Sequence, residues 1–450
     1  MLIPAAVARC LEALEQAGFE AYCVGGCIRD WLLGKGPHDF DLCASATPEE
    51  MKALFHDRAL VLAGEKHGTV GVVTEEGVVE ITTFRKEGTY CDNRHPDRVE
   101  FVTDIQEDLA RRDFTVNAMA WSPKRGLQDP FGGEQDLKKG ILRCVGDPET
   151  RFREDSLRIL RGLRFSVTYS LTPEPETEKA MMSLTALLDH LARERVFGEF
   201  CGFLPQINKE QLLKYAPIIT QVIPELKPTL GFDQHSPHHK YDLYTHIAQV
   251  VDRIPGTLPL RWAALLHDVG KIPTFTRDET GRGHFYGHAQ TGAEMADVIL
   301  RRLKAPTALR QQVVLLIEQH MTRLMPEKRL LKRYLGRWGQ ETVEQLLYLQ
   351  QADMGSKGVP GEEEQEAFET LWRLLKETEQ ESACLTRKDL AVTGRDLTAL
   401  GYQGREVGQK LEELLEAVLD ERAVNEHDAL LEFLKRTGET GGSGQLTVDS

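Results

Sequence analysis

Hydrophobic and polar positions follow two different periods along this chain. Short runs rich in apolar and β-branched residues occur only in the first third, at residues 20–26, 39–45, 68–85 and 98–102. Because helical segments lie between them, these runs predict a mixed α/β unit over residues 1–145. From about residue 146 onward, apolar residues recur every three or four positions, so we expect residues 146–436 to be helical.

Interruptions of the helical pattern predict the domain boundaries. Proline, glycine and histidine cluster around 226–240 and 355–366, and such clusters are typical of connections between folded parts. The end of the chain is polar and rich in glycine, which predicts a disordered tail. We therefore expect an α+β chain with five parts, at residues 1–145, 146–232, 233–358, 359–436 and 437–450.

The composition is that of a soluble globular protein. A chain of 450 residues, 41% hydrophobic and 28% charged, is long enough for several cores. No apolar run approaches the roughly 20 residues that a bilayer span needs. The first residues resemble an amphipathic helix and not a cleavable signal peptide. We expect a cytoplasmic protein without membrane contact, and the pattern leaves the oligomeric state open.

Cysteine spacing and charge exclude two classes of protein. The eight cysteines include no CxxC pair, which argues against a zinc knuckle or a disulfide framework and favours buried thiols. The net charge of −15 argues against a surface that coats nucleic acid, since neutralising phosphates requires clustered lysine and arginine. One local basic stripe remains, the arginine-rich stretch at 151–164.

The stretch "VGGCIRDWLLGKGPHDFDLCAS", at residues 24–45, carries the first candidate site. Gly25 and Gly26 follow an apolar strand and precede a short helix, so they either make an ordinary turn or let a polyphosphate approach the backbone. In "HDFDL", strand periodicity places Asp39 and Asp41 on one face. Two neighbouring carboxylates repel each other unless a cation lies between them, so we favour a Mg²⁺ pair over an exposed edge strand.

A third carboxylate and a family resemblance extend this site. Glu80, in "VVEITTFR", lies in a neighbouring predicted strand and could join the two aspartates or could simply face solvent. The order of the motifs, GG then RD then DxD, resembles the nucleotidyltransferase superfamily of the DNA polymerase β type. That resemblance implies a polymerase-β-like head, with Asp39 and Asp41 as the metal ligands.

The motif "EDSLRILRGLRF" contains a candidate pair for reading nucleobases. At helical spacing Asp155, Arg158 and Arg161 line one face, which on a solvated helix makes an ordinary ion pair. However, a carboxylate accepts from an exocyclic amine and an arginine donates to the adjacent ring nitrogen or carbonyl, so the pair complements cytosine and adenine. Uracil and guanine present a carbonyl in place of the amine, and the carboxylate would reject them.

The stretch "LARRDFTVNAMAW", at 109–121, resembles the ribose-recognising motif of the class II tRNA nucleotidyltransferase and bacterial poly(A) polymerase family. Arg112, Asp113 and Asn117 are the matching positions. The EDxxR signature is similar to that of the CCA-adding members, which implies that Asp155 and Arg158 act as an amino-acid template. Carried over residue by residue, the nucleotide contacts of the family fall on Gly26, Arg29, Arg112, Asp155, Arg158, Arg161 and Arg164.

Two further segments bear on this resemblance. Residues 84–102 resemble the flexible loop that these enzymes need to switch from C to A addition, which favours full CCA addition or A addition. Residues 164–181 lack the glycine that usually follows the arginine-rich helix in this family.

A second set of metal-binding residues begins after residue 235. The adjacent pair in "ALLHDVGK" and the histidines on other helices resemble the HD family of metal-dependent phosphohydrolases. The resemblance implies a metal site at His246, His267, Asp268 and Asp353, and His288 and His320 resemble the extra ligands of two-metal variants. Imidazoles with carboxylates suit Mn²⁺, Ni²⁺, Co²⁺ or Fe²⁺ better than Mg²⁺. A decayed, purely structural site is the alternative.

Together these motifs predict an enzyme that adds CCA to the 3′ end of tRNA from CTP and ATP. The head would be followed by an all-α neck, an HD domain and a helical tail whose "GYQGREVG" at 401–408 is either a phosphate nest or a connector. The alternatives are a bacterial poly(A) polymerase or an A-adding enzyme, and an HD phosphohydrolase with a non-catalytic nucleotide-binding module.

Overall fold

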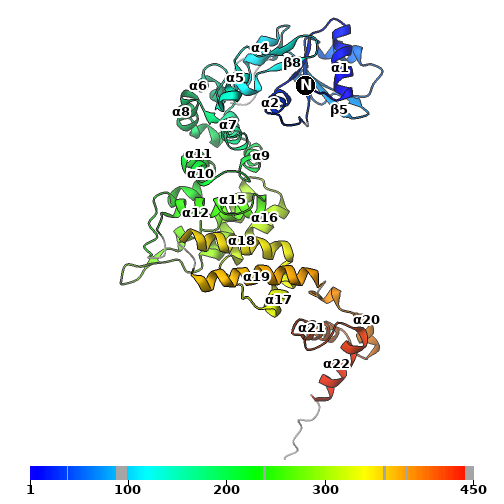
Figure 1. Ribbon diagram of the computed structural model, residues 1–450, viewed down its shortest axis with the longest axis vertical. Coiled ribbons are helices and arrows are strands. Elements are labelled where there is room, and N and C mark those ends of the chain that lie inside the picture. Colours follow the sequence, from blue (N-terminus) through cyan, green and yellow to red (C-terminus); the bar gives the residue numbers. More distant parts are fainter. Residues whose placement is uncertain (38, 88–98, 237–239, 358–360, 382–383, 441–450) are drawn as a thin grey trace, which may run out of the picture. The chain divides into compact units, whose positions relative to one another are not determined.

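A computed structural model describes the chain except for residues 38, 88–98, 237–239, 358–360, 382–383 and 441–450 (Figure 1). Residues 441–450 of the predicted disordered tail and residues 88–98 of the predicted C-to-A switching loop lie outside this description. The chain forms two compact units. The first contains residues 1–228 with 299–306, and the second contains 229–298 with 307–450.

The first unit begins with a seven-stranded sheet in the order β3-β4-β5-β2-β1-β8-β9. The strands are β1 (Ala21–Val24), β2 (Asp41–Ala44), β3 (Leu60–Val61), β4 (Thr69–Thr74), β5 (Gly77–Thr83), β8 (Ala120–Ser122) and β9 (Gly126–Gln128). The central β1 pairs with β2 and β8 and is buried along its whole length. Neighbouring strands are antiparallel except β2 and β5, which are parallel. The predicted mixed α/β head is confirmed.

Helices accompany this sheet and pack a common core with it. They are α1 (Ala5–Gln16), α2 (Gly26–Leu32), α3 (Pro48–Leu54), α4 (Ile105–Ala110) and α5 (Gly133–Lys139), and β6 (Arg85–Glu87) pairs with β7 (Val99–Phe101) beside them. One buried cluster joins Tyr22 and Val24 of β1 to Phe84 and to Leu109 of α4. The sheet is thereby fixed to the segment 105–120 that carries the predicted ribose motif.

Six helices follow in the neck of the first unit: α6 (Pro148–Glu154), α7 (Leu157–Thr168), α8 (Pro175–Ser183), α9 (Arg193–Phe203), α10 (Lys209–Lys214) and α11 (Ala216–Val222). The prediction of helices without strands is nearly correct here, but a short parallel pair joins β10 (Ile141–Leu142) to β11 (Thr172–Pro173). The expected continuous helix through "EDSLRILRGLRF" is wrong. Asp155 has φ −135° and ψ 102°, so α6 ends before it and α7 begins after Ser156.

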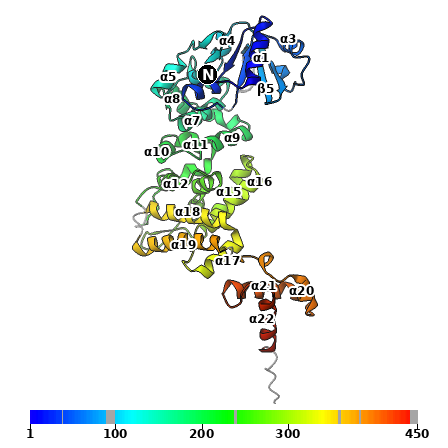
Figure 2. The same ribbon diagram turned by 45° about the vertical axis from the view of Figure 1, so that its right-hand side comes forward.

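The second unit is helical apart from the small hairpin of β12 (Thr276–Arg277) and β13 (Gly283–His284). Its helices within the described residues are α12 (Leu243–Asp252), α13 (Leu258–Leu266), α14 (Lys271–Thr274), α15 (His288–Arg302, whose end belongs to the first unit), α16 (Thr307–Gln319), α17 (Lys328–Trp338), α18 (Gln340–Lys357), α19 (Glu362–Gln380), α20 (Gly394–Ala399), α21 (Arg405–Leu419) and α22 (His427–Thr440). Helices α12, α13, α16 and α18 pack together, and α18 lies above α19 in Figure 2. Among the described ranges no helix is long and apolar enough to cross a membrane.

The end of α7 is conformationally strained. Tyr169 is its C-cap, and the next residue, Ser170, has φ +53°, in the left-handed region. This is the region that a glycine at the end of a helix adopts without cost, whereas a residue with a Cβ atom loses about 1–2 kcal/mol there. The family's usual glycine, missing from this sequence, would therefore suit the backbone that the chain adopts.

Ser170→Gly is expected to stabilise the first unit by about 0.5–1 kcal/mol, because relief of the left-handed strain exceeds the added flexibility of the unfolded chain. Urea unfolding would measure the change. Glu12→Gly, on the exposed face of α1, is the matched control, and it should lose about 0.5–1 kcal/mol. A loss of stability in Ser170→Gly would contradict the assignment of strain.

Candidate functional site

The three carboxylates predicted to bind metal lie in the same part of the head, but their oxygen atoms are not all within 4.8 Å of one another. Strands β2 and β5 are parallel with Leu42 opposite Ile81, so Asp41 and Glu80 occupy the positions just before these partners. Strand β2 begins at Asp41, and Asp39 therefore precedes the strand, where a strand position was expected. Partial loss of hydration raises the pKa of Asp41, and the charges of Asp39 and Glu80 raise it further.

This cluster suits a hard cation. Three carboxylates close enough to raise a pKa repel one another when all are ionised, and an oxygen-binding cation such as Mg²⁺ relieves that repulsion. Asp39 and Asp41 are exposed, so a ligand from solvent can reach them. The positive charge of Arg112 lowers the pKa of Asp41, so a guanidinium lies near the acids.

Arg112 packs against the glycine turn that follows β1. Gly25 has φ +73°, and its N–H donates to the Met119 carbonyl at 3.2 Å. The positive φ favours glycine at this position, and a Cβ atom there would lie 3.0 Å from Nη1 of Arg112, so Arg112 would have to shift slightly. Nη2 of Arg112 donates to the fully buried carboxylate of Asp108 at 3.2 Å. Gly25 and Gly26 thus form a turn against which a fixed guanidinium packs.

Four of the predicted nucleotide contacts form one buried network. Nη1 of Arg29 donates to Oδ1 of Asn117 at 2.7 Å, and Nδ2 of Asn117 donates to Oδ1 of Asp113 at 3.1 Å. Oδ2 of Asp113 accepts from Nε of Arg161 at 2.7 Å. Burial alone would raise the pKa of Asp113, but the Arg161 charge and the Asn117 hydrogen bond outweigh it and hold that pKa below its usual value. The network connects α2 of the head to α7 of the neck.

Asp155 and Arg158 have different partners from those expected. Oδ1 of Asp155 accepts from the Leu157 N–H at 3.0 Å, and Oδ2 accepts from Nη2 of Arg195, in α9, at 2.9 Å. The guanidinium of Arg158 donates to Glu154 at 2.8 Å and to the Arg111 carbonyl at 2.9 Å. Each member of the predicted template pair is therefore held by groups outside the pair.

The remaining predicted arginine is fixed in a similar way. Nε of Arg164 donates to Oε2 of Glu199, in α9, at 2.7 Å. Arg195 and Glu199 lie one turn apart on α9 and hold two of the predicted site residues. Sequence reasoning missed them because only the packing of α9 against α7 reveals their role.

The second unit brings together all six predicted HD residues. Nε2 of His246, in α12, lies 3.0 Å from Oδ1 of Asp353, in α18, and 3.3 Å from Oδ2 of Asp268. Nε2 of His267 lies 3.2 Å from the same oxygen of Asp268. The candidate ligand atoms form two buried groups within 4.8 Å: His246, His267, Asp268 and Asp353, and Asp268, His288 and His320.

The orientation of the imidazoles fits a metal. Nδ1 of His267, His288 and His320 faces a backbone carbonyl at 2.8, 2.8 and 2.6 Å, respectively. If Nδ1 carries the proton, then each Nε2 presents a lone pair toward the carboxylates, and acceptors facing acceptors require a cation. Burial lowers the pKa of His320 to about 4 and also lowers that of His288, which favours the neutral imidazoles that metals bind.

Two lysines that the sequence analysis missed border this cluster. Nζ of Lys271 lies 2.8 Å from Oδ2 of Asp268, and Nζ of Lys357 lies 2.6 Å from Oδ2 of Asp353. Each lysine follows its aspartate by about one helical turn, and this i,i+3 or i,i+4 spacing could have revealed both from the sequence.

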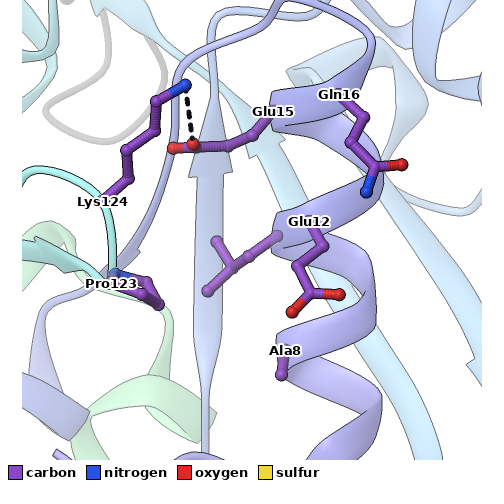
Figure 3. Close-up of a pocket in the computed structure, with 7 residues that line it drawn as sticks. Ala8, Glu12, Glu15, Gln16, Pro123 and Lys124 are labelled. Atoms are coloured by element: carbon purple, nitrogen blue, oxygen red, sulfur yellow. Dashed lines mark ion pairs between the residues drawn. The ribbon is translucent and has the colours of Figure 1, made fainter.

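One groove on the surface of the head belongs to neither candidate site. A groove of about 370 Å³ runs between α1 and the loop after β8, and its lining includes Glu12, Glu15 and Lys124 (Figure 3). Nζ of Lys124 lies 3.4 Å from Oε2 of Glu15 there. None of the predicted site residues lines this groove. In the C-terminal part, Gly404 precedes α21 with φ +55°, and a phosphate nest at this position stays a prediction.

Comparisons with known proteins match both parts of the chain. A family model described as the poly A polymerase head domain matches residues 21–143, and one described as tRNA nucleotidyltransferase domain 2 matches residues 284–434. A CCA-adding enzyme of Enterococcus faecalis is 32% identical over 434 residues, which cover 96% of this chain and 95% of that protein.

Other relatives match over shorter regions. The CCA-adding enzyme of Leuconostoc mesenteroides is 50% identical over 206 residues, 46% of this chain, and that of Ligilactobacillus salivarius is 43% identical over 249 residues, 53% of this chain. The matched regions span 51% and 61% of the lengths of these two relatives.

Solved structures resemble nearly the whole chain. The Bacillus stearothermophilus CCA-adding enzyme in complex with CTP aligns with a TM-score of 0.67 and 27% identity, covering 97% of both chains. The Thermotoga maritima CCA-adding enzyme complexed with tRNA has a TM-score of 0.60 at 20% identity, over 97% of this chain and 96% of that one, and supports the fold.

Asp113→Asn is expected to destabilise the first unit by about 3 kcal/mol at pH 7, because it leaves the Arg161 guanidinium without its charged partner. The folded-state pKa of Asp113 is depressed, so its contribution is complete above the unfolded value of about 4 and is lost as the pH falls through the folded value. Urea unfolding between pH 3 and 7 should therefore show the gap to the wild type closing as the solution becomes acidic. Asp57→Asn, an exposed position, should show no such gap.

Proposed function

The chain belongs to the family of CCA-adding enzymes, and we propose that it adds CCA to the 3′ end of tRNA from CTP and ATP, releasing pyrophosphate. One observation carries this proposal. The network of Arg29, Asn117, Asp113 and Arg161 joins the head to α7, the helix that contains Arg158 and begins just after Asp155. A nucleotide held at Asp39 and Asp41 can thus have its base examined by the neck. These substrates place the activity in the cytoplasm.

In the proposed reaction the 3′-hydroxyl of the RNA attacks the α-phosphate of the bound nucleotide. Asp39 and Asp41 would hold Mg²⁺, which when bound would activate that hydroxyl and neutralise the leaving pyrophosphate. Glu80 lies beside the two ligands and adds to their negative field. Arg112, held by Asp108 against the glycine turn, provides a fixed positive charge for the triphosphate.

Base selection is assigned to Asp155 and Arg158. The Asp155 carboxylate would accept from the exocyclic amine of cytosine or adenine, while Arg158 donates to the adjacent ring atom. Arg195 and Glu154 support this proposal because they fix the two side chains before a nucleotide arrives, which reduces the ordering that binding requires.

Four of the five expected parts of the chain have distinct roles in this proposal. Residues 1–145 carry out nucleotidyl transfer, and residues 146–232 select the base and approach the RNA end. The C-terminal helices of 359–436 contact the tRNA through its backbone and shape. Poly(A) synthesis and addition of A alone use the same head chemistry, and they are distinguished by the products.

The second unit supports a second candidate function, a divalent transition-metal centre that hydrolyses phosphate esters. His246, His267, Asp268 and Asp353 supply the first ligand group, and His288 and His320 extend it. The mixed nitrogen and oxygen donors fit Mn²⁺, Ni²⁺, Co²⁺ or Fe²⁺. Lys357 contacts the oxygen of Asp353 that His246 does not, whereas Lys271 contacts the same Oδ2 of Asp268 that faces His246 and His267.

Asp41→Ala is expected to reduce incorporation of CTP and ATP at least a thousandfold, because the remaining acids cannot hold the cation that the reaction needs. The assay supplies each labelled nucleotide to tRNAs ending before CCA, after CC and after CCA. CC followed by one A supports the proposal. Long A tracts would indicate a poly(A) polymerase, and incorporation limited to CC ends would indicate an A-adding enzyme. Wild-type rates in Asp41→Ala would refute the assignment of the site.

His267→Ala is expected to remove most of the Mn²⁺ or Ni²⁺ that the full chain binds in equilibrium dialysis, while CTP incorporation changes less than twofold. The reason is that the ligands lie in the second unit and the transfer site lies in the first. His284→Ala, a histidine outside both ligand groups, is the control and should retain the metal. Equal metal binding by wild type and His267→Ala would support the purely structural interpretation.

A further inference from the structure

Tyr169, at the C-terminal end of α7, contacts two cations from the head. The guanidinium of Arg29 lies over its ring at 4.1 Å, and Nη2 of Arg29 lies 2.5 Å from its hydroxyl oxygen. Nζ of Lys35 lies 4.7 Å from the same ring. Lys35 comes from the segment between α2 and β2, the segment that leads to Asp39 and Asp41.

Phe165, one helical turn earlier, extends this arrangement. Its ring centre lies 5.3 Å from the guanidinium of Arg29, 5.2 Å from that of Arg161 and 4.5 Å from that of Arg164. The rings of Phe165 and Tyr169 are themselves 6.0 Å apart. Two aromatic side chains of α7 thus touch four cations, three of which are predicted nucleotide contacts.

Rings and carboxylates fix a cation with different consequences. A carboxylate holds an arginine strongly but offsets part of the positive potential that a phosphate would meet, whereas an aromatic face holds it for about 0.5–2 kcal/mol without adding a negative charge. A pocket for a triphosphate needs cations that are both positioned and still positive. Tyr169 meets this need for Arg29, whose Nη1 carries a second hydrogen besides the one given to Asn117.

Arg29 already has one carboxylate partner, and the aromatic face of Tyr169 gives it a further contact without adding a second negative charge. Nη2 of Arg29 lies 2.9 Å from Oδ1 of Asp30, so one negative charge is close to this guanidinium. A second carboxylate in place of the ring would leave Arg29 with no net attraction for phosphate. Lys35, by contrast, is exposed, and the ring is the contact that directs it toward the same region.

We propose that Tyr169 is a positioning residue of the nucleotide pocket, which orients Arg29 and Lys35 toward the triphosphate common to CTP and ATP without neutralising them. The proposal rests on the proposed nucleotidyltransferase function. It separates two tasks of α7: the end near Asp155 and Arg158 reads the base, and the end near Tyr169 serves the phosphates.

The test uses three variants of the full chain. Tyr169→Leu removes the ring, and we expect KM for CTP and for ATP to rise about tenfold by the same factor while kcat changes less than threefold. Tyr169→Phe keeps the ring and should stay within about threefold of the wild type. Tyr169→Glu supplies an acceptor for Arg29 but adds a negative charge, so its KM should rise at least as much as that of Tyr169→Leu.

Direct binding distinguishes this proposal from the proposed function. Calorimetry with inorganic tripolyphosphate, which has neither base nor ribose, should show the same tenfold loss in Tyr169→Leu even if the chain transfers no nucleotide. Discrimination of CTP against UTP should be unchanged in the Tyr169 variants and reduced in Asp155→Ala. Phe203→Leu, a buried aromatic of α9, controls for lost packing and should lower the melting temperature without changing tripolyphosphate affinity. Wild-type tripolyphosphate affinity in Tyr169→Leu or in Tyr169→Glu would overturn the proposal.

Discussion

The buried carboxylate of Asp113 is the charge on which the first unit depends. It accepts from the Phe114 N–H, from Asn117 and from Arg161, so one side chain orders a backbone turn, a head residue and a neck helix together. Because burying a charge without partners costs several kcal/mol, this arrangement is stable only when all of these donors are in place. The position of α7 relative to Asp39, Asp41 and Glu80 therefore depends on Asp113 keeping all of these donors.

The two candidate metal sites solve the problem of concentrated negative charge in different ways. The acids of the head are exposed and share one nearby arginine, which leaves them open to a hydrated cation and a large substrate. The second site is buried, and its carboxylates already have lysines and imidazoles around them. A cation that binds there must replace some of these contacts, and the mixed imidazole and carboxylate donors suit divalent transition metals.

The sequence predicted the head, the helical remainder and the grouping of the HD residues, because strand alternation, helical periodicity and the HD motif are local patterns. It predicted Glu80 on a strand beside Asp41, as the pairing of β2 with β5 shows, whereas Asp39 lies before the strand in which it was expected. It did not predict the break at Asp155, because the sequence there has good helical periodicity, whereas the Asp155 carboxylate accepts from the Leu157 N–H and from Arg195 in the structure. Arg195, Glu199 and Tyr169 were missed for the same reason: their partners lie on other elements.

The break between α6 and α7 has a consequence for how this chain could diversify. Along one continuous helix each residue is rotated by about 100° from the one before it, so one inserted residue rotates every residue beyond it by that angle. Asp155 lies outside α7, whereas Arg158 and Arg161 both lie within it. An insertion in α6 or a change in α9 could therefore redirect the carboxylate while the arginines stay in place. The acceptor Asp155 and the donor Arg158 could therefore change independently, and a new nucleotide preference would require altering only one of them.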